Sequence, residues 1–239
     1  MIDLQLVLLA GLAVLVGAVI QGAVGFGVGL VAAPVVTFLD PSLMPGSLLV
    51  AGFLLPLMSL AAEHRHVDPR VGWVFAGRLL GTVPGVLIVA VSSPEQLAIA
   101  VALMTLVAVA LTVHAFTVPV TRTTLSTAGF FSAIGATAAS IGGPPLGIVY
   151  QRSDPRTVRA TTALVFAVGS LLSMTGLWVV GELPARQVLT GLSFLPFFGV
   201  GFLVSLPVRR RVRGARFRRT LLAVVAVSAL AVLVRYLPW

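Results

Sequence analysis

The sequence predicts an all-α polytopic membrane protein. Hydrophobic residues make up 58% of its 239 residues and charged residues only 10%, and the mean hydropathy is +1.09. Such a composition leaves too little polar surface to cover a soluble globule. Apolar runs long enough for membrane helices follow one another along almost the whole chain. We therefore expect a single membrane domain over residues 1–239.

Eight membrane segments are predicted from these runs. They cover residues 4–39, 46–62, 71–92, 95–117, 124–150, 160–180, 187–207 and 217–234. The first holds 36 residues and the fifth 27, whereas about 20 residues cross a bilayer once. Because these two segments also contain the densest small-residue sequence of the chain, we predict that both are broken or re-entrant helices.

The two long segments carry glycine and proline where a regular helix would not. The first contains "QGAVGFGVGLVAAP", residues 21–34, and the fifth contains "GATAASIGGPPLG", residues 135–147. Glycine tolerates backbone angles that are closed to other residues. Pro144 and Pro145 remove two backbone donors and disfavour helix just before them. The pattern therefore predicts one helix break in each segment.

Landmarks of the first half recur in the second half at a nearly constant offset. The offset is 115 residues from Gly25-Phe26-Gly27 to Ser140-Ile141-Gly142, 114 from Asp40-Pro41 to Asp154-Pro155, and 116 from Arg70 and Gly85 to Arg186 and Gly201. We infer a duplication, with repeat one over residues 4–117 and repeat two over residues 124–236. Duplicated transporters often bind substrate where the broken helices of the two repeats meet, near the membrane midplane.

A glycine-rich "GFGxG" followed by proline, echoed by "SIGGPP" in the second half, resembles the sulfite exporter TauE/SafE family of bacterial membrane proteins. The resemblance covers the whole chain. It implies export of small organic or inorganic sulfur oxyanions, such as sulfite or sulfoacetate, across the inner membrane.

The two glycine-rich stretches are the predicted anion-binding site. An unwound glycine run brings bare N–H groups to a ligand, and the positive end of the resumed half-helix favours an anion. The candidate residues are Gln21, Gly22, Gly25, Phe26, Gly27, Gly29, Thr137, Ser140, Gly142, Gly143 and Pro144. The alternative for the glycines is close helix packing. Gln21 is either a ligand-facing amide or part of an interhelix hydrogen bond.

Arg78 lies about eight residues into the third segment, where a cation is costly unless it is paired or hydrated. Its guanidinium would attract the substrate anion. The alternative is that its long side chain extends to the nearer membrane interface. No carboxylate lies deep in any predicted segment, so a proton relay through buried acids is not indicated.

Other function classes find less support in the composition. The chain has no Cys, three His and seven carboxylates, so we expect no metal site and no cofactor. An intramembrane hydrolase would pair Ser132 or Ser140 with His114, but no GxSxG motif accompanies them. A membrane assembly protein that transports nothing would leave the paired breaks unexplained. The oligomeric state is open.

The net charge of +9 does not indicate nucleic-acid binding. Seven of the sixteen arginines lie between Arg209 and Arg219, in a short loop that the positive-inside rule assigns to the cytoplasm. The arginines of loop 150–159 indicate the same side. Strict alternation of eight crossings would put the basic loop 63–70 outside. If the long segments are re-entrant hairpins, the repeats are inverted and this loop turns inward, which is the arrangement we favour.

Overall fold

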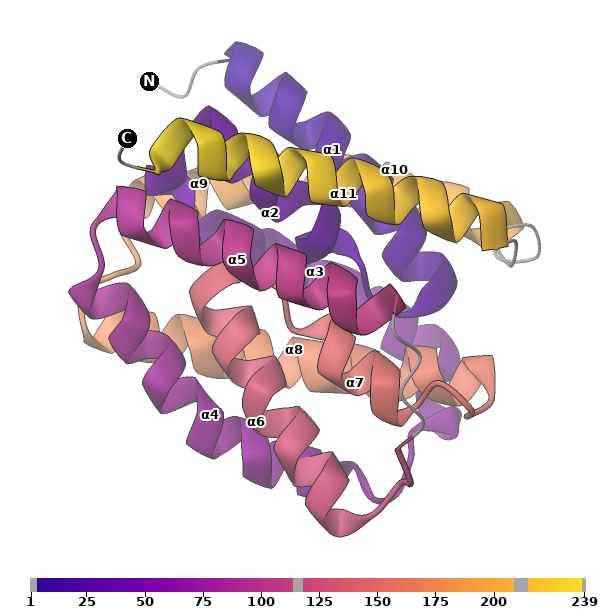
Figure 1. Ribbon diagram of the computed structural model, residues 1–239. Helices are drawn as coiled ribbons and strands as arrows, with labels where there is room; N and C mark the ends of the chain where they lie inside the picture. The colour runs from indigo at the N-terminus through magenta and orange to yellow at the C-terminus, as the bar shows by residue number, and fades with distance from the viewer. Residues whose placement is uncertain (1–3, 114–117, 209–214, 238–239) are drawn as a thin grey trace.

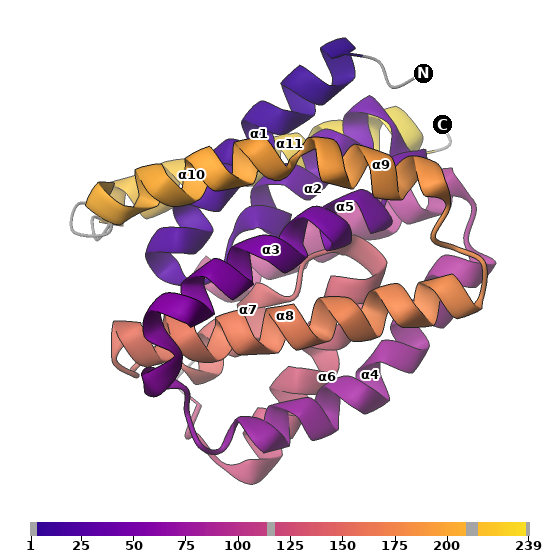
Figure 2. The ribbon, with the colours of Figure 1, turned by 180° about the vertical axis from the view of Figure 1, so that it is seen from behind.

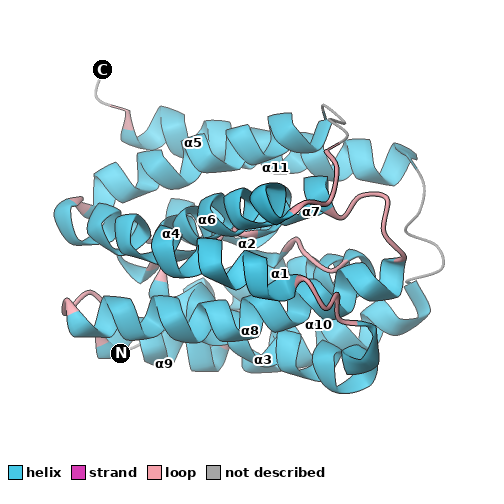
Figure 3. Cartoon of the chain, turned by 90° about the horizontal axis from the view of Figure 1, so that it is seen from below, coloured by secondary structure: helices cyan, strands magenta, loops and turns pink. Residues whose placement is uncertain are grey.

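The computed structural model describes residues 4–113, 118–208 and 215–237, with side chains from Leu222 onward in the last range. All regular structure in these ranges is helical (Figures 1 and 3). The helices are α1 Leu4–Val24, α2 Val28–Leu39, α3 Gly46–Glu63, α4 Val71–Val91, α5 Pro94–Val113, α6 Arg122–Ala139, α7 Gly143–Val149, α8 Pro155–Val179, α9 Ala185–Ser193, α10 Leu195–Val208 and α11 Ala215–Tyr236. Two short 3-10 turns, η1 Pro41–Leu43 and η2 His64–His66, follow α2 and α3.

Six stretches of the described residues are long and apolar enough to cross a membrane. They are Leu4–Val24, Gly46–His66, Val71–Val91, Pro94–Val113, Pro155–Val179 and Ala185–Val208. A multi-pass helical membrane protein is thus confirmed, whereas the expected number of eight spans is not. In the second half, the predicted segment 124–150 is divided into the 18-residue α6 and the seven-residue α7, and neither is among the six stretches. The described apolar part of α11 is Leu222–Tyr236, which is also short.

Each helix break turns the chain back on itself. A Cβ atom on Gly17 of α1 would lie 2.8 Å from the Cα atom of Val28, the first residue of α2, so α2 folds back against α1. In the same way, the Ser132 hydroxyl of α6 donates a 2.6 Å hydrogen bond to the carbonyl of Gly142, just before α7. The long segments are therefore hairpins, α1–α2 and α6–α7, and not single crossings.

The most extensive helix pairs each join a helix of the first half to a helix of the second half. α4 lies along α6 and α10 lies along α1, while α3 packs against α8 and α5 against α11 (Figures 1 and 2). The last residue of α3, Glu63, forms a 2.7 Å ion pair with Arg159 in the first turn of α8, so these two helices run antiparallel. Ala98 near the start of α5 and Val232 near the end of α11 share one core cluster, which makes this pair antiparallel as well.

The basic turns described by the structure gather at one end of the bundle. In Figure 2 the ends of α3 and α10 and the turn before α8 lie on the left, opposite the two chain termini. The backbone N–H of Asp68 donates to the Thr161 hydroxyl at 2.9 Å, which joins loop 63–70 to the start of α8. Burial raises the pKa of the Asp68 carboxyl, but hydrogen bonds from Arg70 outweigh this effect and hold that pKa below its usual value. Strict alternation would put loops 63–70 and 150–159 on opposite sides, whereas the structure places them at the same end of the bundle (Figure 2).

The arginines within residues 209–214 lie outside the described residues. For the later arginines, up to Arg219, the structure gives only the backbone. α10 ends at Val208, at the same end of the bundle as the turn before α8 (Figure 2).

The two hairpins meet at their breaks. A Cβ atom on Gly29 in the first turn of α2 would overlap the carbonyl oxygen of Ser140. The ring of Phe26 fills the space beside Gly143 and Gly147 of α7, where Cβ atoms would lie 2.6 Å from ring or Cβ carbons of Phe26. Backbone-to-backbone contact therefore fixes one break against the other.

We predict that Gly29→Ala destabilises this contact. The added methyl group would meet a carbonyl oxygen that belongs to a break and has little room to move, so the free energy of unfolding should fall by roughly 1–3 kcal/mol. Gly199→Ala in α10 is the matched control, because nothing lies within 4 Å of its Cβ position, and a helical alanine there should stabilise by about 0.5–1 kcal/mol. Thermal unfolding in detergent measures both changes, and equal midpoints for the two variants would contradict the contact.

Candidate functional site

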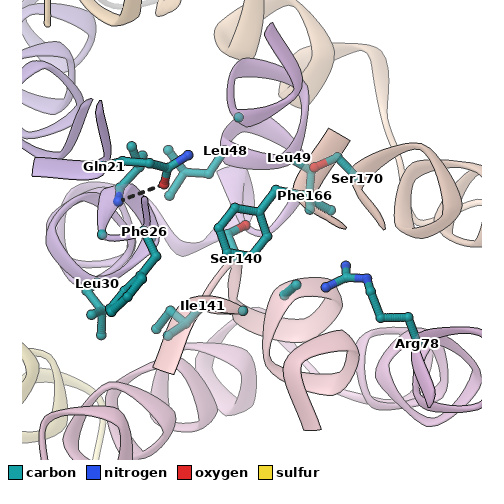
Figure 4. Close-up of a pocket in the computed structure, with 17 residues that line it drawn as sticks. Gln21, Phe26, Leu30, Leu48, Leu49, Arg78, Ser140, Ile141, Phe166 and Ser170 are labelled. Carbon is teal, nitrogen blue, oxygen red and sulfur yellow. Dashed lines mark hydrogen bonds between the residues drawn. The ribbon is translucent and has the colours of Figure 1, made fainter. Parts of the chain in front are cut away.

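A cavity of about 60 Å³ lies where the two hairpins meet. Its walls come from both breaks and from α3, α4 and α8 (Figure 4). The lining residues are Gln21, Phe26, Gly27, Val28, Gly29, Leu30, Leu48, Leu49, Gly52, Arg78, Ala136, Ser140, Ile141, Gly142, Gly143, Phe166 and Ser170. At about 10–15 Å³ for each water-sized group, this volume holds roughly four to six such groups. The cavity therefore suits a small ion of a few heavy atoms.

The first break depends on glycine backbone angles and on one side-chain amide. Gly25 has φ 106° and Gly27 has φ 145°, a region that L side chains rarely adopt. The Gln21 side-chain oxygen accepts a 3.2 Å hydrogen bond from the Val28 N–H. Of the two roles considered for Gln21, the hydrogen bond between helices is therefore present, and the residue lines the cavity as well. The amide satisfies one of the free donors at the start of α2.

The second break is held by hydroxyl groups. Ser140 adopts a left-handed conformation, with φ 59°, and its hydroxyl donates a 3.1 Å hydrogen bond to the carbonyl of Pro45 before α3. The Ser132 hydroxyl binds the Gly142 carbonyl. Pro144 and the next residue, also proline, occupy the first turn of α7 and have no N–H. Backbone donors are therefore fewer at α7 than at α2, although the sequence pattern treats the two breaks as equivalent.

Arg78 is buried between helices and does not reach the membrane interface. Its side chain is 1% exposed, and it points toward the cavity (Figure 4). Its Nη1 donates a 2.9 Å hydrogen bond to the Ser132 hydroxyl. From the other side, α8 approaches so closely that a Cβ atom on Gly169 would overlap the guanidinium. The alternative of a side chain extended to the interface is thus wrong, because Arg78 lies on the face of α4 that packs against α6 and α8.

One donor of this guanidinium has no partner in the part of the chain that the structure describes. Arg78 Nε is buried and makes no hydrogen bond to any described part of the chain. The three ion pairs found among the described residues, those of Asp68, Glu63 and Asp40, all lie in turns at the ends of the bundle. The cavity therefore contains a buried cation with an unused donor and no carboxylate beside it.

The structure brings most of the predicted site residues to the cavity. Those that line it are Gln21, Phe26, Gly27, Gly29, Arg78, Ser140, Gly142 and Gly143. They come from two hairpins that lie more than 100 residues apart in the sequence, together with α4. The contact between the two stretches at their breaks agrees with the sequence prediction.

Four predicted residues lie beside the cavity without lining it: Gly22, Gly25, Thr137 and Pro144. A Cβ atom on Gly22 would overlap the Ser205 hydroxyl of α10, so this glycine permits close packing. Thr137 is fully buried, and its hydroxyl lies 2.7 Å from that of Ser173 in α8. The packing interpretation of small residues therefore accounts for Gly22, and Thr137 serves a contact between helices.

Two walls of the cavity were not predicted. Leu48, Leu49 and Gly52 come from α3, and Phe166 and Ser170 come from α8. Neither helix carries a local motif that marks it as part of a site. The available signal was the repeat itself, because α3 and α8 are the helices that directly follow the two hairpins.

The arrangement offers no support for hydrolysis. The Ser132 hydroxyl accepts a hydrogen bond from Arg78 and donates one to Gly142, and His114 lies outside the described residues. Within the described ranges, no three metal-binding side chains come together.

A comparison with protein families gives one match. The family model described as sulfite exporter TauE/SafE matches residues 9–232 of the 239-residue chain. No curated protein matches, and no solved structure does. The matched range contains both helix breaks and the whole cavity. Because it covers nearly the entire sequence, the chain belongs to the sulfite exporter TauE/SafE family, whose members are membrane transporters and not enzymes.

Proposed function

We propose that this transporter exports small sulfur oxyanions, such as sulfite or organosulfonates, and that it binds them in the cavity between the two hairpins. Membership of the TauE/SafE family supports the transport of such anions. The size of the cavity and its position at the meeting point of two helix breaks support the site.

The buried guanidinium of Arg78 is the observation that carries the proposal. A charged side chain inside a membrane is costly unless a partner compensates it, and Arg78 has no carboxylate partner among the described residues. The guanidinium faces a cavity whose described lining contains no acid (Figure 4), while its Nε atom is enclosed by protein and has no partner among the described residues. An anion that enters the cavity would supply the missing negative charge.

The start of α2 supports the same proposal. The N–H groups in the first turn of a helix have no acceptor within that helix, and the helix dipole makes this end positive. Gln21 occupies the Val28 donor, and the next two donors belong to Gly29 and Leu30, which also line the cavity. We propose that the anion binds between these N–H groups and Arg78, with a smaller contribution from the proline-rich start of α7.

We further propose that residues 4–117 and 124–236 form inverted repeats of one transport domain in a bacterial inner membrane. Each hairpin returns to the side from which it starts, so three full crossings remain in each half: α3, α4 and α5, then α8, α9–α10 and α11. An odd number of crossings reverses the second half relative to the first. The antiparallel course of α3 and α8 supports this topology. The basic end of the bundle would face the cytoplasm.

Replacing the buried cation should abolish most transport. Arg78→Gln removes a charge-assisted contact worth about 1.5–3 kcal/mol, so we expect sulfite flux into liposomes to fall by at least about tenfold. The folded yield should hold, because a neutral side chain removes an uncompensated buried charge. Arg186→Gln is the control, since the Arg186 side chain is 57% exposed and pairs with Asp40 outside the cavity. Full flux through folded Arg78→Gln protein would remove Arg78 from the site.

Filling the cavity should block transport without disturbing the fold. Gly52 lines the cavity, and nothing lies within 4 Å of its Cβ position. Gly52→Leu should therefore occupy the anion's space with no steric clash, whereas a side chain at Gly27 would also meet the strain of φ 145°. Gly199→Leu has equally open space away from the cavity and serves as the control. Flux and folded yield are measured together, and unchanged flux in Gly52→Leu protein would argue against this cavity as the site.

Single-cysteine labelling tests the topology, because the chain has no native Cys. An impermeant maleimide applied to intact cells should label Ser93→Cys, which is exposed in the α4–α5 turn. His66→Cys and Arg152→Cys, exposed at the opposite end, should be labelled only after the cells are permeabilised. Labelling of His66→Cys but not Arg152→Cys from outside would restore strict alternation in place of inverted repeats.

A further inference from the structure

The described residues that line the cavity carry a single fixed charge. Arg78 is the one ionisable side chain among the described residues that line it. The remaining polar side chains, those of Gln21, Ser140 and Ser170, are neutral. The nearest helix start, that of α2, adds a partial positive charge of about one half at most. The positive charge around the cavity can therefore balance one negative charge on the anion, but not two.

The position of this charge is also fixed. The Ser132 hydroxyl holds Arg78 Nη1 at 2.9 Å and is itself anchored on the Gly142 carbonyl at 2.6 Å. Gly169 of α8 closes the other side of the guanidinium. With Nη1 already engaged, the buried Nε remains as a donor without a partner in the described structure. The positive charge is thus held in one position beside the cavity.

The rest of the lining is largely apolar. Phe26, Leu48, Leu49 and Phe166 offer carbon surface to the cavity. A second ionised oxygen directed at this surface would lose its hydration without gaining a cation. A methyl or methylene group there would bury apolar area favourably.

We propose that the site selects singly charged sulfur oxyanions. Sulfite would be carried as hydrogensulfite, and organosulfonates would be accepted when the sulfonate is their only ionised group. Sulfate and sulfoacetate, each with two negative charges, would be rejected. Of the two substrates that the family resemblance implies, the proposal therefore keeps sulfite and excludes sulfoacetate. This inference rests on the proposed function, because it concerns the anion bound at the same cavity.

Methanesulfonate and sulfate form a matched pair for the test. Both are tetrahedral and of similar size, since a methyl group in one replaces an ionised oxygen in the other. In liposomes that contain the intact protein, with the membrane potential clamped, methanesulfonate should compete with labelled sulfite at least about tenfold better than sulfate does. Equal competition by the two anions would overturn charge selection and leave the proposed function standing. An absence of protein-dependent sulfite flux would instead defeat both.

The pH dependence of flux gives a second measurement. Sulfite exchanges between its singly and doubly charged forms near neutral pH, whereas methanesulfonate keeps one charge throughout. Sulfite flux, corrected with protein-free liposomes, should rise as the pH falls, in proportion to the hydrogensulfite fraction, while methanesulfonate flux stays flat. A sulfite flux that is independent of pH, or a parallel rise with methanesulfonate, would overturn the proposal. Arg78→Gln should lower the flux of both anions, and it should not improve competition by sulfate, because a dianion loses more than a monoanion when the cation is removed.

Discussion

Unsatisfied backbone groups are the constraint on which this structure depends. A helix break exposes N–H and C=O groups that hydrocarbon cannot solvate, so irregular backbone at membrane depth has to be enclosed by protein or water. The two breaks of this chain enclose one another, with Gly29 against the carbonyl of Ser140. Side chains satisfy part of the remainder, as Gln21 does for Val28 and Ser132 does for Gly142. The groups that are left over define the wall of the cavity.

The same reasoning accounts for the charge. A guanidinium at this depth is tolerated only where polar groups or an ion can reach it, and Arg78 has one hydroxyl from α6 and a cavity in front of it. The free energy needed to bury this charge is offset by the packing of α4 along α6, which is the most extensive helix contact in the described structure. Glycines on both helices, Gly77 and Gly129 among them, bring the two backbones into direct contact. Rigid packing and a costly charge therefore occur on the same pair of helices.

The glycine and proline residues at the two breaks made these breaks predictable from the sequence. The hairpin fold, the burial of Arg78 and the part that α8 plays in the cavity carry no such local signal. In the sequence, a glycine run marks the first break, and in the structure Gly25 and Gly27 adopt positive φ there. Paired prolines follow the second break, Ser140–Gly142. Whether each break continues a crossing or reverses it depends on contacts such as Gly17 with Val28, which no composition reveals. The burial of Arg78 follows from the rotation of α4 about its axis, and an apolar sequence leaves that rotation undetermined. Phe166 and Ser170 were missed because α8 is an ordinary membrane helix in every local respect.

Each hairpin is tied to a helix of the opposite half. The Thr162 hydroxyl of α8 lies 2.9 Å from the Gly25 carbonyl oxygen, and the Ser140 hydroxyl binds the carbonyl of Pro45, where α3 begins. α3 and α8 also pack against each other, and both line the cavity. A displacement of α8 along α3 would therefore pull on both breaks in one movement. Through these two hydroxyl groups, a movement of either helix would reach the breaks of both halves at once.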